Sequence, residues 1–177
     1  MKIVLVDYGA GNVQSVKYAV KRLGYEPILT KNHEEICSSD KVIFPGVGSA
    51  KAAMEQLNMS GLDQLIPTLK QPVLGICVGM QLMCEYSYEG DVKCLGIIDS
   101  EVKRFGGDLK IPHMGWNTIS DFKSTIFEQS LENEQVYFVH SYYVPVNKYT
   151  IAKTSYGLDF SAAIKKDNFY AVQFHTE

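Results

Sequence analysis

Short apolar runs alternate with amphipathic stretches through the first half of the chain. Runs rich in branched apolar residues that could form buried strands lie at residues 3–6, 27–30, 41–44 and 73–76. Apolar residues at helical spacing predict helices over residues 13–23 and 50–57. Strands that alternate with helices are typical of a parallel sheet covered by helices. We therefore predict an α/β fold with an open, mostly parallel or mixed central sheet flanked by helices.

The first predicted helix is delimited by two residues that favour helix ends. Asn12 precedes the first periodic residue, where its side chain can accept a hydrogen bond from the first turn. Gly24 follows the last periodic residue and can adopt the left-handed conformation that ends many helices. We expect Asn12 to cap this helix and Gly24 to stop it.

The pattern changes beyond about residue 92. β-Branched and aromatic residues now cluster in short runs with turn residues between them, which favours mixed or antiparallel strands. The clearest of these runs lie at residues 136–140, 149–154 and 170–174. A single late helix is predicted over residues 124–131. No repeat, linker or low-complexity tract interrupts the chain, so we expect one domain over residues 1–177.

The charge balance excludes several classes of partner. Seventeen Lys and Arg against twenty Asp and Glu give a net charge of -3, which does not favour nucleic acid or an anionic membrane. The N-terminal apolar run ends at Asp7, and no stretch approaches about 18 uninterrupted apolar residues. We expect a cytoplasmic protein with no nucleic-acid and no membrane partner.

The chain contains four cysteines, namely Cys37, Cys77, Cys84 and Cys94. They show no C-x-x-C pairing and have no histidine at zinc-finger spacing, which argues against a disulfide framework and a structural metal. We expect free thiols and no metal site.

Cys77 stands out because glycines flank it. The segment 73–81 (VLGICVGMQ) predicts a buried strand that turns sharply into a helix, with Gly75 and Gly79 two residues before and after the cysteine. The start of a helix favours an anion, so a thiolate is favoured there. The alternative is that Cys77 is one more small buried residue, as we expect for the other three cysteines. The two glycines favour a nucleophile.

His175 and Glu177 follow the last predicted strand. In an extended segment, residues two apart point to the same face about 6.5 Å from each other, so Glu177 can orient the imidazole of His175. A thiol, an imidazole and a carboxylate form the triad of acyl-transfer enzymes, and strand ends of an α/β sheet bring such groups together. Without the cysteine turn, a strand-end histidine and a solvated glutamate would be the simpler interpretation.

Two backbone segments could stabilise an oxyanion. One is the N–H of Val78, directly after the nucleophile, and the other is the turn 45–48 (PGVG), where Val47 lies between two glycines. An ordinary strand-to-helix loop explains that turn equally well.

Together the turn 45–48, the segment 75–81 and the ending 173–177 (QFHTE) resemble the class I, triad-type glutamine amidotransferases. The resemblance covers essentially the whole chain and implies a flavodoxin-like sheet. It implies that Cys77 attacks the side-chain amide of glutamine, that His175 protonates the departing ammonia, and that water releases glutamate from a thioester.

The resemblance also implies a substrate pocket and no cofactor or metal. Gln81 and Glu89 would hold the α-amino and carboxylate ends of glutamine, with Gly48, Ser141 and Tyr142 lining the pocket. A zwitterionic substrate does need one anion and several donors, and Gln81 lies one helical turn beyond the nucleophile.

Within that family, the segments 7–12, 112–117 and 137–142 resemble the glutaminase subunits that serve imidazole glycerol phosphate synthases in histidine biosynthesis. This implies a heterodimer with a (β/α)8-barrel cyclase, which receives ammonia through an internal passage and forms imidazole glycerol phosphate and an aminoimidazole ribonucleotide. It places Asn12, Met114 and Trp116 near the interface, although a lone tryptophan is as often a core anchor.

The sequence departs from the family pattern at two places. Thr176 stands where the family usually has proline, which keeps the alternation but does not restrict φ. The family continues past the glutamate into a Lys-Ser pair and a helix that covers the sheet, whereas this sequence ends at Glu177. We therefore expect a domain without the family's C-terminal helix.

The sequence is also compatible with three other functions. Gly9 and Gly11 follow the first strand as in a dinucleotide-binding module, but Gln14 occupies the third glycine position and the second strand does not end in an acidic residue. A glutaminase for another synthetase, such as one that modifies surface sugars, would carry the same triad. A cysteine peptidase-like hydrolase would leave Gln81 without a purpose.

Overall fold

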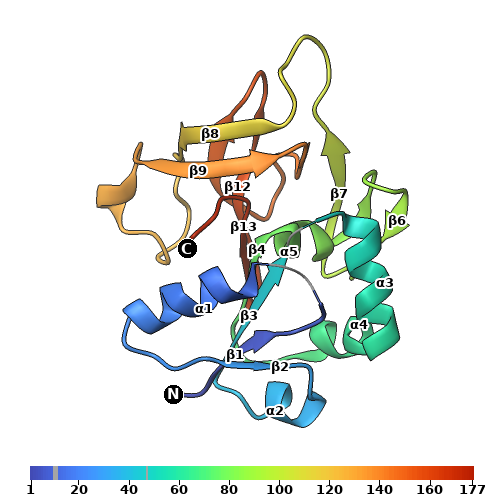
Figure 1. Cartoon of the computed structure of the whole chain (residues 1–177). Helices are drawn as coiled ribbons and strands as arrows, with labels where there is room; N and C mark the ends of the chain where they lie inside the picture. Colours follow the sequence, from blue (N-terminus) through green and yellow to red (C-terminus); the bar gives the residue numbers. More distant parts are fainter. Residues whose placement is uncertain (10–11, 47) are drawn as a thin grey trace.

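The protein is described by a computed structural model that covers residues 1–9, 12–46 and 48–177 (Figure 1). Within these residues the central sheet has seven strands in the order β11-β12-β13-β4-β3-β1-β2. Five neighbouring strands run parallel, namely β1 (Ile3–Val6), β2 (Ile28–Thr30), β3 (Lys41–Gly46), β4 (Val73–Cys77) and β13 (Phe169–Val172). The strands β12 (Asp159–Lys166) and β11 (Thr150–Ser155) extend one edge in antiparallel pairing. The expected mixed, mostly parallel sheet is confirmed.

Helices cover both faces of this sheet. The connection from β1 to β2 carries α1 (Val13–Arg22), and the connection from β3 to β4 carries α3 (Ala50–Ser60) and α4 (Leu62–Leu65). Because these two right-handed connections run in opposite directions across the sheet, their helices lie on opposite faces. Figure 1 shows α1 on one side and α3 and α4 on the other. The short α2 (His33–Cys37) precedes β3.

The ends of α1 confirm one expectation and correct another. Gly24 has φ 86°, and its N–H donates to the carbonyl of Lys21 at 2.9 Å, so the glycine ends the helix as predicted. Asn12 lies at the start of α1 but has φ 63° and makes no side-chain capping bond. The capping prediction is wrong because Asn12 has a left-handed backbone in place of the extended backbone typical of a capping residue, and its Nδ2 binds Glu177.

The second half of the chain adds two smaller sheets. One has the order β10-β7-β5-β6 and contains β5 (Cys84–Ser87), β6 (Val92–Lys93), β7 (Ile98–Arg104) and β10 (Tyr142–Tyr143). The other is an antiparallel ribbon of β8 (His113–Thr118) and β9 (Gln135–His140), which Figure 1 shows beyond one end of the central sheet. The runs predicted at 136–140, 149–154 and 170–174 correspond to β9, β11 and β13.

The late helix predicted over residues 124–131 is wrong. The structure has only a 3₁₀ turn at Gln129–Leu131 in this segment. The Ser124 hydroxyl accepts the N–H of Ile126 at 3.5 Å, a local bond that competes with a helix. Phe127 stacks on Phe122 with ring centroids 4.9 Å apart, whereas Ile126 and Leu131 stay exposed. The apolar side chains therefore do not share one helical face.

The largest fully buried side chains include Leu5, Phe44, Met80, Phe138 and Phe160. They come from all parts of the chain, which joins the two halves into one core. Among the residues that the structure covers, no helix has the length and apolar character needed to cross a membrane.

Candidate active site

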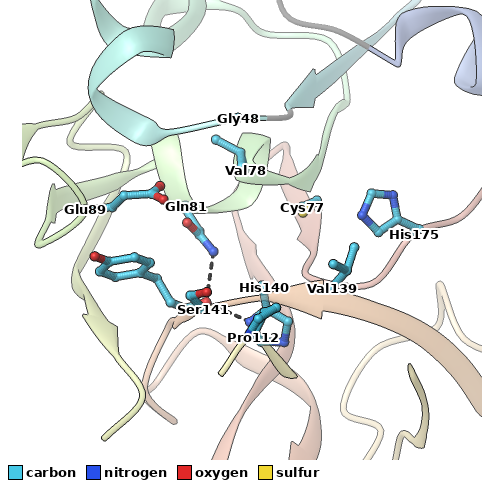
Figure 2. Close-up of a pocket in the computed structure, with 11 residues that line it drawn as sticks. Gly48, Cys77, Val78, Gln81, Glu89, Pro112, Val139, His140, Ser141 and His175 are labelled. Carbon is cyan, nitrogen blue, oxygen red and sulfur yellow. Dashed lines mark hydrogen bonds between the residues drawn. The ribbon is translucent and has the colours of Figure 1, made fainter. Parts of the chain in front are cut away.

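The candidate site lies where parallel strands end. Cys77 is the last residue of β4, and His175 follows β13, the parallel neighbour of β4. Parallel neighbours end at the same edge of a sheet, so both side chains reach one cavity of about 350 Å³ (Figure 2). The residues that line it are Gly48, Cys77, Val78, Gln81, Glu89, Pro112, Val139, His140, Ser141, Tyr142 and His175.

The turn at Cys77 is held in an unusual conformation by close backbone packing. Cys77 has φ 53° and ψ -112°, a region that residues with a Cβ rarely adopt, and α5 (Val78–Leu82) begins directly after it. A Cβ on Gly79 would overlap the carbonyl oxygen of Phe44, and one on Gly75 would lie 3.0 Å from the Gly79 backbone. The two glycines therefore allow the helix to start against the sheet, as the sequence predicted.

His175 and Glu177 form the second part of the site. The Nδ1 of His175 is 2.8 Å from Oε1 of Glu177, which leaves Nε2 for the cavity. This Nε2 is buried and has no hydrogen-bond partner within the described part of the chain. The pKa of His175 is raised to about 10, first by interaction with the Cys77 sulfur and then by the bond to Glu177. The cavity thus holds the Cys77 sulfur beside an imidazole that retains its proton.

Donors from His175, Asn12 and Thr176 hold the carboxylate of Glu177. Burial would raise its pKa, but the bond to His175 and other hydrogen bonds outweigh this and lower the pKa. The Nδ2 of Asn12 donates to the same Oε1 at 2.6 Å. Asn12, expected near a partner interface, is therefore also a direct neighbour of the triad. Asn12 follows β1, which ends at the same edge of the sheet as β4 and β13, and this position could have predicted that Asn12 lies near the triad.

Of the two residues predicted to bind an oxyanion, the structure describes Val78 and not Val47. Val78 is the first residue of α5, so its N–H is not bonded within the helix, and the residue lines the cavity. Val47 lies outside the described residues. Its neighbour Gly48 has φ 84°, and a Cβ on Gly46 would collide with the backbone at Val78 and Gly79.

All five residues expected to bind substrate line the same cavity, with Glu89 and Gln81 toward one end and His175 toward the other (Figure 2). Glu89 Oε2 accepts the N–H of Ala50, the first residue of α3, at 2.8 Å. Burial raises the pKa of Glu89, and the Ala50 bond partly counters it. The second carboxylate oxygen has no hydrogen-bond partner in the part of the chain that the structure describes, so it remains for a ligand.

Gln81 has less freedom than the sequence suggested. It is 2% exposed, and its Nε2 donates to the carbonyl of Tyr142 at 3.0 Å and to Oε1 of Gln173 at 2.9 Å. Both N–H groups are thus used inside the protein. Only the amide oxygen of Gln81 remains as an acceptor for a ligand.

Two polar residues of this site, Gln173 and His140, were not predicted from the sequence. Gln173 is fully buried, and its Nε2 lies 3.7 Å from Sγ of Cys77. It stands two residues before His175, so strand alternation could have placed both on one face. His140 lines the cavity at the end of β9, where no local pattern distinguished it from a core residue.

Met114 and Trp116 lie away from the cavity on β8. They are 62% and 68% exposed, so Trp116 is not a core anchor. Trp116 packs edge-on against Tyr137, its partner across the ribbon, with ring centroids 5.7 Å apart. The carbonyl of Tyr137 in turn accepts the N–H of His175 at 3.0 Å.

Comparison with known proteins agrees with this geometry. The family model "Glutamine amidotransferase class-I" matches residues 4–177, and the chain belongs to this family. Within it, the chain is 57% identical over 180 residues to "Imidazole glycerol phosphate synthase subunit HisH" of Bacteroides fragilis, covering 100% of this chain and 92% of the relative. A subunit of the same name from Vibrio parahaemolyticus is 46% identical, covering 99% of this chain and 90% of the relative.

A solved structure supports the fold independently. The "Crystal structure of glutamine amidotransferase" superposes with a TM-score of 0.76 at 18% identity, covering 97% of this chain and 89% of that chain. Family membership argues against the nucleotide-binding module and the peptidase-like hydrolase. The glycines that suggested a nucleotide site are Gly9 and Gly11, of which Gly11 lies outside the described residues.

Proposed function

We propose that this protein hydrolyses glutamine to glutamate and ammonia with Cys77, His175 and Glu177, and that the ammonia serves a cyclase subunit in histidine biosynthesis. One observation carries the proposal: the thiol that ends β4 and the imidazole that follows β13 line one cavity. The carboxylate of Glu177 binds Nδ1, so Nε2 is the nitrogen directed at the thiol and the substrate.

The first half of the reaction forms a thioester. The Cys77 thiolate attacks the side-chain amide carbon of glutamine, and the carbonyl oxygen becomes an oxyanion that the N–H of Val78 can bind. The imidazolium of His175 donates its Nε2 proton to the amide nitrogen, and the C–N bond breaks to release ammonia. Glu177 stabilises the imidazolium through this step.

The second half returns the enzyme to its starting state. Neutral His175 removes a proton from water, the resulting hydroxide attacks the thioester carbon, and the oxyanion re-forms at the same donor. Collapse breaks the C–S bond, releases glutamate and leaves the thiolate beside the imidazolium. Neither step requires a metal or an organic cofactor.

The polar groups of the cavity suit the amino-acid end of glutamine. The free oxygen of Glu89 and the amide oxygen of Gln81 are acceptors for an α-ammonium group. The Ser141 hydroxyl and the backbone at Gly48 and Tyr142 line the cavity and could supply donors to the α-carboxylate. A carboxylate for an ammonium group and donors for a carboxylate favour a zwitterion over a peptide or a nucleotide.

The names of the relatives support a synthase partner, because they describe subunits of imidazole glycerol phosphate synthase. For this chain we propose a (β/α)8-barrel cyclase that contacts the exposed Met114 and Trp116 and the region of Asn12. The backbone connection from Trp116 through Tyr137 to His175 would let that contact influence the imidazole. A synthetase for surface sugars has no comparable support.

The test uses the subunit assembled with its cyclase and supplies nitrogen in two forms. With wild-type protein, glutamine and ammonium should both support formation of the cyclase product. Cys77→Ala should abolish the glutamine-dependent reaction and retain the ammonium-dependent one. Cys37→Ala is the matched control, since Cys37 is exposed on α2 and does not line the cavity. Glutamine-dependent synthesis by the Cys77→Ala complex would overturn the proposal.

A further inference from the structure

Gln173 places an amide in the interior beside the nucleophile. Its side chain has no exposed surface, so its polar atoms must find partners inside the protein. Two partners are present: Oε1 is 2.9 Å from Nε2 of Gln81, and Nε2 is 3.7 Å from Sγ of Cys77. The sulfur is therefore the acceptor that satisfies the buried amide nitrogen.

The orientation of this amide follows from hydrogen-bond chemistry. The carbonyl of Tyr142 can only accept, so the Gln81 atom 3.0 Å away must be the nitrogen. The NH₂ group of Gln81 then faces Gln173, which must present its oxygen there. It follows that the NH₂ group of Gln173 faces Cys77, because the reversed amide would set two donors against each other.

The carbonyl of Tyr142 also determines which ring nitrogens of His140 and His113 carry a proton. His140 Nδ1 lies 2.7 Å from the Tyr142 oxygen and must carry the proton, which makes its Nε2 an acceptor. The Nδ1 of His113 is 3.1 Å from this Nε2 and must donate, while Asn117 Nδ2 approaches the other nitrogen of His113 at 3.3 Å. Burial lowers the pKa of both histidines, that of His140 to about 4, so each ring keeps one proton.

Among the residues that the structure covers, two titratable groups interact with the sulfur besides this neutral donor. His175 supplies a positive charge as described above. Tyr8 is buried near Cys77, but its hydroxyl donates to the carbonyl of Pro45 at 2.7 Å, so this proton is not directed at the thiol. The amide of Gln173 does not titrate, so it is a neutral donor at every pH.

We propose that Gln173 is a further catalytic residue: its amide N–H donates to Sγ of Cys77 and stabilises the thiolate, in an orientation set by Gln81 and the Tyr142 carbonyl. The inference rests on the proposed function only in that Cys77 is the nucleophile. A donor to a sulfur anion favours the anion over the thiol, whereas an oxygen at the same place would disfavour it.

The experiment measures the rate at which iodoacetamide alkylates Cys77 in the full chain, by mass spectrometry of the peptide that contains it, over a series of pH values. Gln173→Glu replaces the donor with a carboxylate oxygen of the same shape. It should lower the alkylation rate near neutral pH about tenfold or more and move the rate profile to higher pH. Gln173→Met removes the donor without adding charge and should give a smaller change in the same direction.

Gln71→Glu is the matched control. Gln71 precedes β4 at the end opposite Cys77, and its Nε2 donates to the carbonyl of Ile36 at 2.8 Å. This variant should keep the wild-type alkylation profile.

Circular dichroism reports folding for each variant, and Gln173→Met carries the test if Gln173→Glu does not fold. Wild-type alkylation profiles in the folded Gln173 variants would overturn the proposal. Because alkylation needs no turnover, its outcome is independent of whether the chain hydrolyses glutamine.

Discussion

The side-chain amide of Asn12 donates a hydrogen bond to Glu177, 165 positions later in the chain, at 2.6 Å. The acceptor is the same Oε1 that binds Nδ1 of His175. Asn12 thereby fixes the carboxylate that orients the imidazole, although it never touches the thiol. The first connection of the sheet and the end of the chain thus meet at the triad.

We predict that Asn12→Ala lowers kcat of the isolated chain for glutamine about tenfold with little change in KM, because the carboxylate loses a donor that orients it. Steady-state hydrolysis without a partner separates this effect from any effect on assembly. Asn58→Ala, on α3 and away from the triad, is the control and should keep wild-type values. Equal kcat for Asn12→Ala and wild type would show that the bond is not needed.

The raised pKa of His175 predicts an alkaline limit to activity. The imidazolium is the acid for the departing ammonia, so hydrolysis should decline as pH rises toward the pKa of about 10. The sign for stability is the same: the contribution of the protonated ring is fully present below its ordinary pKa of 6.5 and is lost as pH approaches 10. Glu177→Gln removes the charge that Nδ1 contacts and should move the alkaline limb of the rate profile to lower pH. An unmoved limb would contradict this assignment.

Buried His140 predicts a loss of stability in acid. Its folded pKa, about 4, lies below the ordinary 6.5, so the unfolded chain binds more protons and stability falls as pH decreases through this window. The loss attributable to His140 is up to about 3 kcal/mol, and His113 acts in the same direction. Urea unfolding at several pH values measures it. His140→Phe, which can join the surrounding aromatic rings, should flatten the dependence, and an unchanged slope would argue against it.

The packing at the cysteine turn predicts a strong effect of one methyl group. Gly79→Ala places a Cβ into the carbonyl oxygen of Phe44 and should cost about 3 kcal/mol or more of unfolding free energy, or prevent folding. Gly106→Ala is the matched control, because no heavy atom lies within 4 Å of its added Cβ. Denaturant titration should give near wild-type stability for Gly106→Ala. Similar stability for both variants would contradict the packing described here.

Much of the fold followed from local pattern. The runs that became β1 and β4 are apolar over their whole length, and β3 is apolar after the exposed Lys41, as expected for parallel strands buried on both faces. Gly24 ended its helix through a conformation that only glycine adopts easily. The helix prediction for residues 124–131 was wrong because the serines of this segment bond locally and its apolar residues lack a common face. The composition favoured a helix, but within the described part of the chain the tertiary contacts that would stabilise one are missing.

The sequence predicted those site residues that lie close together in a short segment. Cys77 was recognisable because its flanking glycines predict a sharp strand-to-helix turn. His175 and Glu177 were recognisable because residues two apart in an extended segment share a face. The bonds from Asn12 to Glu177 and from Gln81 to Gln173 join residues far apart in sequence, and no spacing rule predicts them. For the same reason, the sequence could not reveal that both donors of Gln81 are used inside the protein.

The most direct test of the account is to trap the covalent intermediate. Wild-type protein mixed with glutamine and quenched in acid should carry a glutamyl thioester on the peptide that contains Cys77, and mass spectrometry can detect it. Cys77→Ala protein should carry none, and the peptides with Cys37, Cys84 and Cys94 should stay unmodified in both. Glutamate formation by the Cys77→Ala protein, or a thioester on any other cysteine, would contradict the assignment of Cys77 as the nucleophile.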